Sequence, residues 1–223
     1  DGLYHGEGIY YYREDSPYKS FVGKYKNDYP YEGIYTLSNG KPDSKGFRNS
    51  EGQLHGEGTN YFYSEDGSLY LILTGTFKNG LCHGICSEMF SDGSSFKGEY
   101  VNGDRDGIGL LQLNYVTETG YFDENGLQGN GIYKNSIVNY EWEGPYINGL
   151  KNGQGVATFL DKGEKFSVTF ENDSYIGLED LTFENLSANK RLALIIGNDE
   201  YVSNPLQFAV ADSKGIAIAL EDA

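Results

Sequence analysis

The chain has 223 residues, including 31 glycines, 20 tyrosines and 12 phenylalanines but only one methionine and one tryptophan. This composition favours many short strands joined by tight turns, so we expect a mainly β protein. The 17 basic and 33 acidic residues give a formal net charge of −16. Such a charge argues against nucleic acid and anionic lipid as partners, because both would be repelled.

Residues 1–177 contain a recurring phrase in which two aromatic or aliphatic residues flank a glycine and an Asn-Gly pair follows. A Gly-x-Gly signature comes after each phrase, and the two together recur about every 25 residues, which gives about seven repeats. In the copy at 119–126 we interpret one extra residue as a β-bulge. The clear copies read LTGTFKNG at 73–80, FKGEYVNG at 96–103 and WEGPYING at 142–149; the irregular ones are FVGKYKND at 21–28, TGYFDENG at 119–126 and FSVTFEND at 166–173.

Each repeat unit has the pattern of a β-hairpin. In Phe96, Gly98 and Tyr100 the spacing of two places all three positions on one face of a strand, where the glycine leaves room for a neighbouring ring. The Asn-Gly pair supplies the positive φ angles of a tight reversal. One hairpin is marginally stable alone, so the units must stack to bury their rings. We therefore predict one elongated antiparallel sheet of about seven hairpins.

These units resemble MORN repeats, and the resemblance covers about residues 2–177. It implies a single twisted sheet with one groove lined by aromatic residues. It also implies a scaffold that holds protein partners, such as an extended peptide or a large assembly, and it allows a dimer. The resemblance is compatible with a membrane contact, but the acidic charge of the region argues against lipid binding through electrostatics.

Four aromatic residues have two interpretations. Phe96, Tyr100, Trp142 and Tyr146 occupy the regular aromatic positions of the phrase, which favours a structural role in stacking the hairpins. Alternatively, aromatic side chains in the groove bind an extended peptide by stacking and by hydrogen bonding to its amides. They are the candidate groove residues.

No metal or cofactor site is expected. Cys82, His83 and Cys86 form a CHxxC string, but no second Cys/His pair follows at a usable spacing, and a structural zinc site needs four ligands. His5 and His55 stand at the same place in their repeats as His83, so the repeat itself explains them. Two cysteines are too few for a disulfide framework, which fits a reducing compartment.

The pattern changes after residue 177. Residues 178–189 lack the Gly-x-Gly signature and are expected to be a connector. Residues 192–196 are five consecutive apolar residues, which is typical of a strand buried on both faces. Asn204-Pro205 then begins a predicted amphipathic helix that extends to about residue 222. We expect residues 190–223 to be the first strand and helix of an α/β domain whose remainder lies in further sequence.

Residues 190–223 resemble the opening of caspase-like cysteine peptidases, especially metacaspases and paracaspases. The segments RLALIIGNDEY and PLQFAVADSKGIAIAL carry the resemblance. In that family the nucleophilic Cys and its His lie downstream, so this chain holds no catalytic residue. Asp212 matches the helix aspartate of the pocket for the residue before the cut, which implies specificity for Arg or Lys. The alternative is a solvated helix carboxylate.

Two functions remain open at this stage. In the first, the repeats are a scaffold or targeting arm of a caspase-like cysteine endopeptidase with Arg/Lys specificity, so whether the longer protein is an enzyme stays undecided. In the second, the chain is a purely structural protein of a cytoskeletal or ciliary assembly with a degenerate peptidase-like domain. The expected location is the cytoplasm. Sequence beyond residue 223 would discriminate between them, through the presence or absence of a Cys–His pair.

Overall fold

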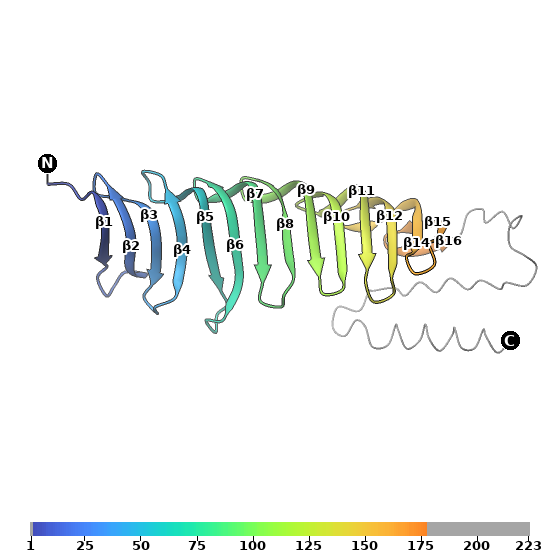
Figure 1. Ribbon diagram of the computed structural model, residues 1–223, viewed down its shortest axis with the longest axis horizontal. Coiled ribbons are helices and arrows are strands. Elements are labelled where there is room, and N and C mark those ends of the chain that lie inside the picture. Colours follow the sequence, from blue (N-terminus) through green and yellow to red (C-terminus); the bar gives the residue numbers. More distant parts are fainter. Residues whose placement is uncertain (1, 178–223) are drawn as a thin grey trace, which may run out of the picture.

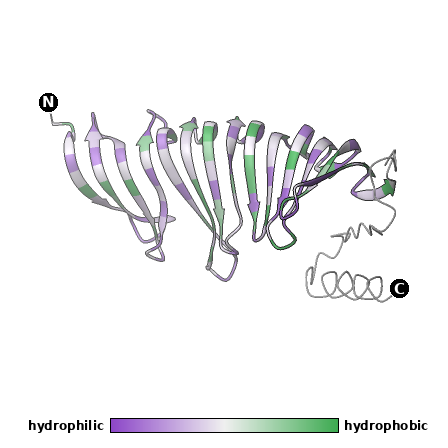
Figure 2. Cartoon of the chain, turned by 45° about the vertical axis from the view of Figure 1, so that its right-hand side comes forward, coloured by the Kyte–Doolittle hydropathy of each residue, from purple (hydrophilic) through white to green (hydrophobic). Residues whose placement is uncertain are grey.

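The structure is a computed structural model that describes residues 2–177. These residues form one elongated antiparallel sheet in which the strands follow one another in sequence order, with β13 paired to β12 beside this path (Figure 1 and Figure 2). The predicted single sheet of hairpins is confirmed. The predicted connector and the predicted α/β unit, with Asp212, lie outside the described residues. The strands are β1 (Gly6–Tyr11), β2 (Tyr18–Lys26), β3 (Tyr29–Leu37), β4 (Pro42–Arg48), β5 (Leu54–Tyr63), β6 (Leu69–Lys78), β7 (Leu81–Phe90), β8 (Ser95–Val101), β9 (Asp104–Leu113), β10 (Val116–Asp123), β11 (Gly126–Asn135), β12 (Tyr140–Ile147), β13 (Leu150–Lys151), β14 (Gly153–Phe159), β15 (Glu164–Glu171) and β16 (Ser174–Gly177).

The Asn-Gly pairs make the tight turns that the sequence predicts. Asn102 and Gly103 join β8 to β9 with φ angles of 53° and 99°, and Asn148 and Gly149 follow β12 with φ angles of 53° and 77°. Two consecutive positive φ angles are typical of a type I′ hairpin turn, whose twist matches that of the flanking strands. The bulge predicted for the extra residue of 119–126 is not found on that strand, because β10 pairs with β9 without a register shift. The β10–β11 register does shift between Gly120 and Tyr121, but the residues without a partner on β10 are Gly129 and Asn130 of β11.

Five turns along one edge of the sheet are linked to the hairpin that precedes them. In each link a backbone N–H of one turn donates to a carbonyl oxygen at the start of the Gly-x-Gly strand in the preceding hairpin. We call these contacts the turn links. They are Asp28 to Tyr4 at 3.1 Å, Gly80 to Leu54 at 2.8 Å, Gly103 to Cys82 at 2.9 Å, Gly149 to Leu127 at 3.0 Å and Asp173 to Lys151 at 3.0 Å.

A row of positions, nearly all of them glycine, crosses the sheet from β1 to β15 at matching register. It places glycine opposite glycine on neighbouring strands, and only Cys86 and the final Val168 depart from it. We call it the glycine row, and it consists of Gly8, Gly23, Gly33, Gly46, Gly58, Gly75, Cys86, Gly98, Gly109, Gly120, Gly131, Gly144, Gly155 and Val168.

The glycine row makes room for rings on one face of the sheet, which we call the core face. A methyl group added at Gly98 would lie 2.7 Å from Cζ of Phe96, and one at Gly155 would lie 2.7 Å from Cε2 of Trp142. The rings contact one another edge to face from repeat to repeat, with 5.0 Å between the centroids of Phe96 and Phe122. The core is therefore a row of aromatic rings packed on glycines, as the alternation of aromatic residues and glycines along each strand predicts.

Cations cover some of these rings at the rim of the core. The Arg105 guanidinium lies 4.1 Å from the ring centroid of Phe96 and pairs with Glu88. The Lys151 ammonium lies 3.8 Å from the ring centroid of Tyr133 and 4.0 Å from the carboxylate of Asp173. Such contacts stabilise a partly buried charge on the negative face of a ring. Long basic side chains thus close the core of a sheet that has no second layer in the described residues.

Candidate functional site

The four aromatic candidates lie in the core. Phe96, Tyr100, Trp142 and Tyr146 have relative exposures of 0%, 2%, 0% and 2%. They pack on each other, with 5.8 Å between the ring centroids of Phe96 and Tyr100 and 5.1 Å between those of Trp142 and Tyr146. The surface that a partner would meet in this conformation is therefore made by other residues.

The Tyr146 hydroxyl is buried, and no hydrogen-bond partner is present for it in the described part of the chain. Burial raises the pKa of this hydroxyl well above its usual value of 10.0, and the nearby carboxylates of Glu118 and Asp173 raise it further. The folded protein thus keeps the proton at a pH where an unfolded tyrosine loses it.

We expect this proton to make stability depend on alkaline pH. Below about pH 10 both states hold the proton and the contribution is constant; above it, unfolding releases the proton and the free energy of unfolding falls by about 1.4 kcal/mol per pH unit for this group. The measurement is the free energy of unfolding, obtained from urea titrations between pH 8 and 11. Above about pH 10 it should fall less steeply with pH in Tyr146→Phe, by the equivalent of one proton. Equal slopes in both proteins would contradict this assignment.

The opposite face of the sheet, which we call the open face, carries the side chains that alternate with the core residues. Over β1 to β6 it contains a hollow of about 870 Å³. Its floor is the backbone of the glycine row from Gly8 to Gly58, and side chains of the neighbouring positions stand on either side of that floor. The hollow runs across the strands, along the length of the sheet.

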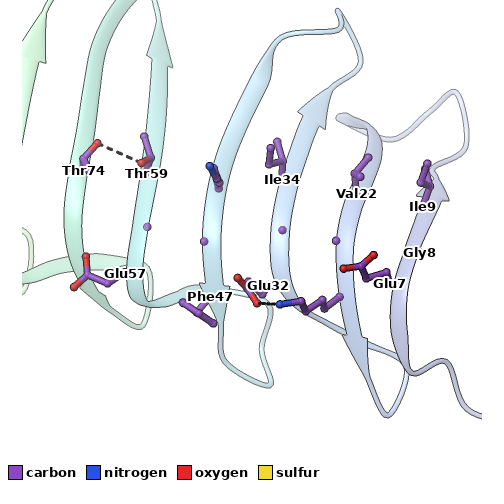
Figure 3. Close-up of a pocket in the computed structure, with 16 residues that line it drawn as sticks. Glu7, Gly8, Ile9, Val22, Glu32, Ile34, Phe47, Glu57, Thr59 and Thr74 are labelled. Carbon is purple, nitrogen blue, oxygen red and sulfur yellow. Dashed lines mark hydrogen bonds and ion pairs between the residues drawn. The ribbon is translucent and has the colours of Figure 1, made fainter.

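The two walls of the hollow differ in chemistry. Ile9, Val22 and Ile34 pair in register across β1, β2 and β3 and stand side by side in Figure 3. We call these three residues the aliphatic row, and their relative exposures are 58%, 45% and 37%. The same register continues through Lys45 to Thr59 and Thr74, whose hydroxyls are 3.3 Å apart. This wall is apolar at one end and polar at the other.

The second wall is mainly charged and lies along the other line of side chains in Figure 3. Lys24 pairs with Glu32 at 2.8 Å, and this hydrogen bond raises the pKa of Lys24. Glu57 accepts a hydrogen bond of 2.9 Å from Thr76 and forms none of the ion pairs found among residues 2–177. Glu7 likewise forms no ion pair within that range. The wall therefore offers two separate carboxylates to cationic groups, one on β1 and one on β5.

A second charged cluster lies on the core side of β10 to β15. Burial raises the pKa of Glu118, and the positive charge of Lys151 opposes that shift. Lys151 also donates its backbone N–H to Asp173 at 2.7 Å. These side chains are engaged with the rings and turns around them, so the cluster stabilises the fold.

The metal candidates of the sequence do not form a ligand set. Within residues 2–177 no group of three or more His, Cys, Asp or Glu side chains could hold a metal ion. His83 accepts a hydrogen bond of 3.4 Å from the backbone of Asn102. Cys82 and Cys86 are paired as a disulfide. This pair was not predicted, because two cysteines are too few for a disulfide framework. The same described range contains no helix long and apolar enough to cross a membrane.

The aliphatic row is not among the site residues predicted from the sequence. Ile9, Val22 and Ile34 stand next to glycines of the repeat, and a signal for them was present because each occupies the place beside the central glycine. Their meeting on one face depends on the register between three strands, which the spacing within one repeat does not supply.

Comparison with known proteins supports the repeat assignment. The family model for the MORN repeat matches residues 1–15, 74–95, 96–113 and 142–163. MORN repeats are therefore detected in the chain, and they coincide with strands of the sheet. The same comparison gives no support to a caspase-like domain at residues 190–223. No curated protein matches the chain in a sequence search.

Proposed function

We propose that this chain is a scaffold module that binds a protein segment in the hollow on the open face of β1 to β6. The observation that carries the proposal is the aliphatic row, three exposed apolar side chains in register beside a backbone floor. Exposed apolar side chains gathered in a hollow are typical of surfaces that meet a partner. MORN repeats are commonly protein-binding or membrane-binding modules, and the acidic charge favours a protein over an anionic membrane.

The dimensions of the hollow favour an extended segment as the partner. Strands lie about 4.8 Å apart, so the distance from β1 to β6 is about 24 Å, which about seven extended residues span. Aliphatic side chains of this segment would pack on Val22 and Ile34. One lysine or arginine would lie near Glu7 on β1 and another near Glu57 on β5, since neither carboxylate forms any of the ion pairs described above. The partner is therefore an extended peptide that combines aliphatic and basic residues.

Charge reversal of the apolar wall tests this function. Peptides selected from a random display library on the full chain should be enriched in aliphatic and basic residues. Val22→Asp and Ile34→Asp should each weaken their binding about 10-fold or more, because a carboxylate would replace an apolar contact. The matched control is Val156→Asp, which changes an exposed valine of the same face on β14. Equal weakening by Val156→Asp, or no selected motif, would refute the docking site.

We further propose that residues 190–223 begin a caspase-like cysteine endopeptidase domain, in which Asp212 recognises Arg or Lys. The support is the sequence alone: the apolar run, the Gly197-Asn198 pair, the Pro205-Leu206 pair and Asp212 occur in the order typical of metacaspases and paracaspases. On this proposal the repeats would deliver a peptidase to the protein that the hollow binds. The competing proposal is a purely structural protein, which predicts no peptidase activity in any polypeptide that includes residues 190–223.

A further inference from the structure

Cys82 and Cys86 occupy two positions that other repeats fill with a leucine and a glycine. In the repeats of β5 and β11 these pairs are Leu54 with Gly58 and Leu127 with Gly131. There the leucine covers the glycine: a methyl group added at Gly58 would lie 3.1 Å from Cδ2 of Leu54, and one at Gly131 would lie 2.7 Å from Cδ2 of Leu127. The repeat on β7 instead fills the same space with two sulfur-bearing side chains.

The backbone of the repeat brings the two cysteines together. An extended strand would separate residues four apart by about 13 Å, yet the Cα atoms of Cys82 and Cys86 are 6.5 Å apart. The chain bends between them at Gly84, where φ is 99°. Gly56 bends β5 in the same way with φ of 98°. The bend thus belongs to the fold and would hold the two thiols close in the reduced state as well.

The surroundings of the pair connect it to the neighbouring strands. Both cysteines are 1% exposed. Cys86 lies in the glycine row between Gly75 on β6 and Gly98 on β8. Its sulfur is 3.5 Å from the carbonyl oxygen of Thr76, where the β6–β7 register shifts. Any displacement of this sulfur therefore acts on the contact between β6 and β7.

We propose that Cys82 and Cys86 form a reversible dithiol/disulfide site that sets how firmly β7 joins the two halves of the sheet. Bonded sulfurs lie about 2 Å apart, whereas two thiols need a van der Waals separation of roughly 3.5 Å or more. A closely packed interior has little room for that change. In a repeat array each unit is held by its neighbours, so a weaker contact at β7 loosens the sheet locally between β1–β6 and β8–β16.

The chemistry is a thiol–disulfide exchange. A low-molecular-weight dithiol reduces the pair: one of its thiolates attacks a cysteine sulfur, the bond between Cys82 and Cys86 breaks, and a mixed disulfide forms. Its second thiol then displaces the protein sulfur. The dithiol becomes a cyclic disulfide, and its two protons end on the two cysteines. Oxidation by a low-molecular-weight disulfide runs in the opposite direction. Because both sulfurs are buried, either reaction proceeds through local opening of β7.

Hydrogen–deuterium exchange of the full chain, with and without dithiothreitol, tests the proposal. Reduction should speed amide exchange in β6 to β8 about 10-fold and leave β14 and β15 unchanged. Subsequent oxidation with glutathione disulfide should restore the protection and leave no thiol that iodoacetamide labels after denaturation. The closed loop is short, so the pair constrains the unfolded chain weakly and the effect should be local.

The control is the double variant Cys82→Leu/Cys86→Gly, which gives β7 the residues found at these positions in β5 and β11. Its exchange should not respond to dithiothreitol. If this variant does not fold, reduction and reoxidation of the natural chain still decide the matter. Unchanged exchange in β6 to β8 upon reduction, an equal response in the variant, or thiols that stay labelled after glutathione disulfide treatment would each overturn the proposal.

Discussion

Replacing Gly155 with alanine should lower the free energy of unfolding by about 3 kcal/mol. The added methyl group would lie 2.6 Å from the carbonyl oxygen of Glu143 and 2.7 Å from Cε2 of Trp142. The oxygen belongs to the paired backbone of β12, and Trp142 is fully buried, so neither can move without disturbing its neighbours. Urea unfolding followed by tryptophan fluorescence would measure the loss, since Trp142 is the one tryptophan of the chain.

The matched control is Gly8→Ala, the same substitution in the same glycine row. On β1 the added methyl group would come no closer than 3.5 Å to Tyr25, which is ordinary contact. Its effect should stay within about 0.5 kcal/mol, because alanine also restricts the unfolded chain. Similar losses at both positions would show that backbone flexibility, and not space for the ring of Trp142, explains the glycine row.

Asp212→Asn should lower kcat/KM for peptides with Arg or Lys before the cut by about two to three orders of magnitude, in a polypeptide that carries the whole peptidase domain. An unpaired substrate guanidinium in a buried pocket costs roughly 3–5 kcal/mol. The measurement is hydrolysis of fluorogenic peptides with Arg, Lys or Asp at that position.

The control for Asp212→Asn is Asp222→Asn, which removes a carboxylate from the end of the same predicted helix. It should leave kcat/KM nearly unchanged, and both variants should melt at the temperature of the natural protein. A natural preference for Asp, or full activity of Asp212→Asn, would mean that Asp212 is a solvated charge. The peptidase domain that follows the repeats would then have a specificity other than Arg or Lys.

The repeat phrase was sufficient to predict the strands, the turns and the packing of rings on glycines. Phe96, Gly98 and Tyr100 lie within one strand, so their common face follows from alternation alone. Asn102-Gly103 is local in the same sense, because the φ angles of a turn depend on the residues that form it.

Features that depend on the pairing between strands could not be predicted in this way. The aliphatic row needs the register of β1, β2 and β3, and the disulfide needs the bend at Gly84 inside β7. The burial of Phe96, Tyr100, Trp142 and Tyr146 agrees with the structural role that their places in the phrase favoured, whereas the residues that face a partner in their stead depend on strand pairing. The structure within one hairpin can be predicted from its own residues, whereas a surface shared by several hairpins requires the register between them.

The turn links have a mechanical consequence. Because five turns are tied to the hairpin before them, the spacing between those hairpins is fixed at one edge as well as within the ladder of strand hydrogen bonds. At about 4.8 Å per strand, the end of the hollow at β6 and the last strand β16 are about 43 Å apart along the sheet. The sheet would then be a rigid spacer that holds a partner bound at the N-terminal strands at a fixed distance from the residues after Gly177. Partners would be selected by that distance as well as by their contacts with the hollow.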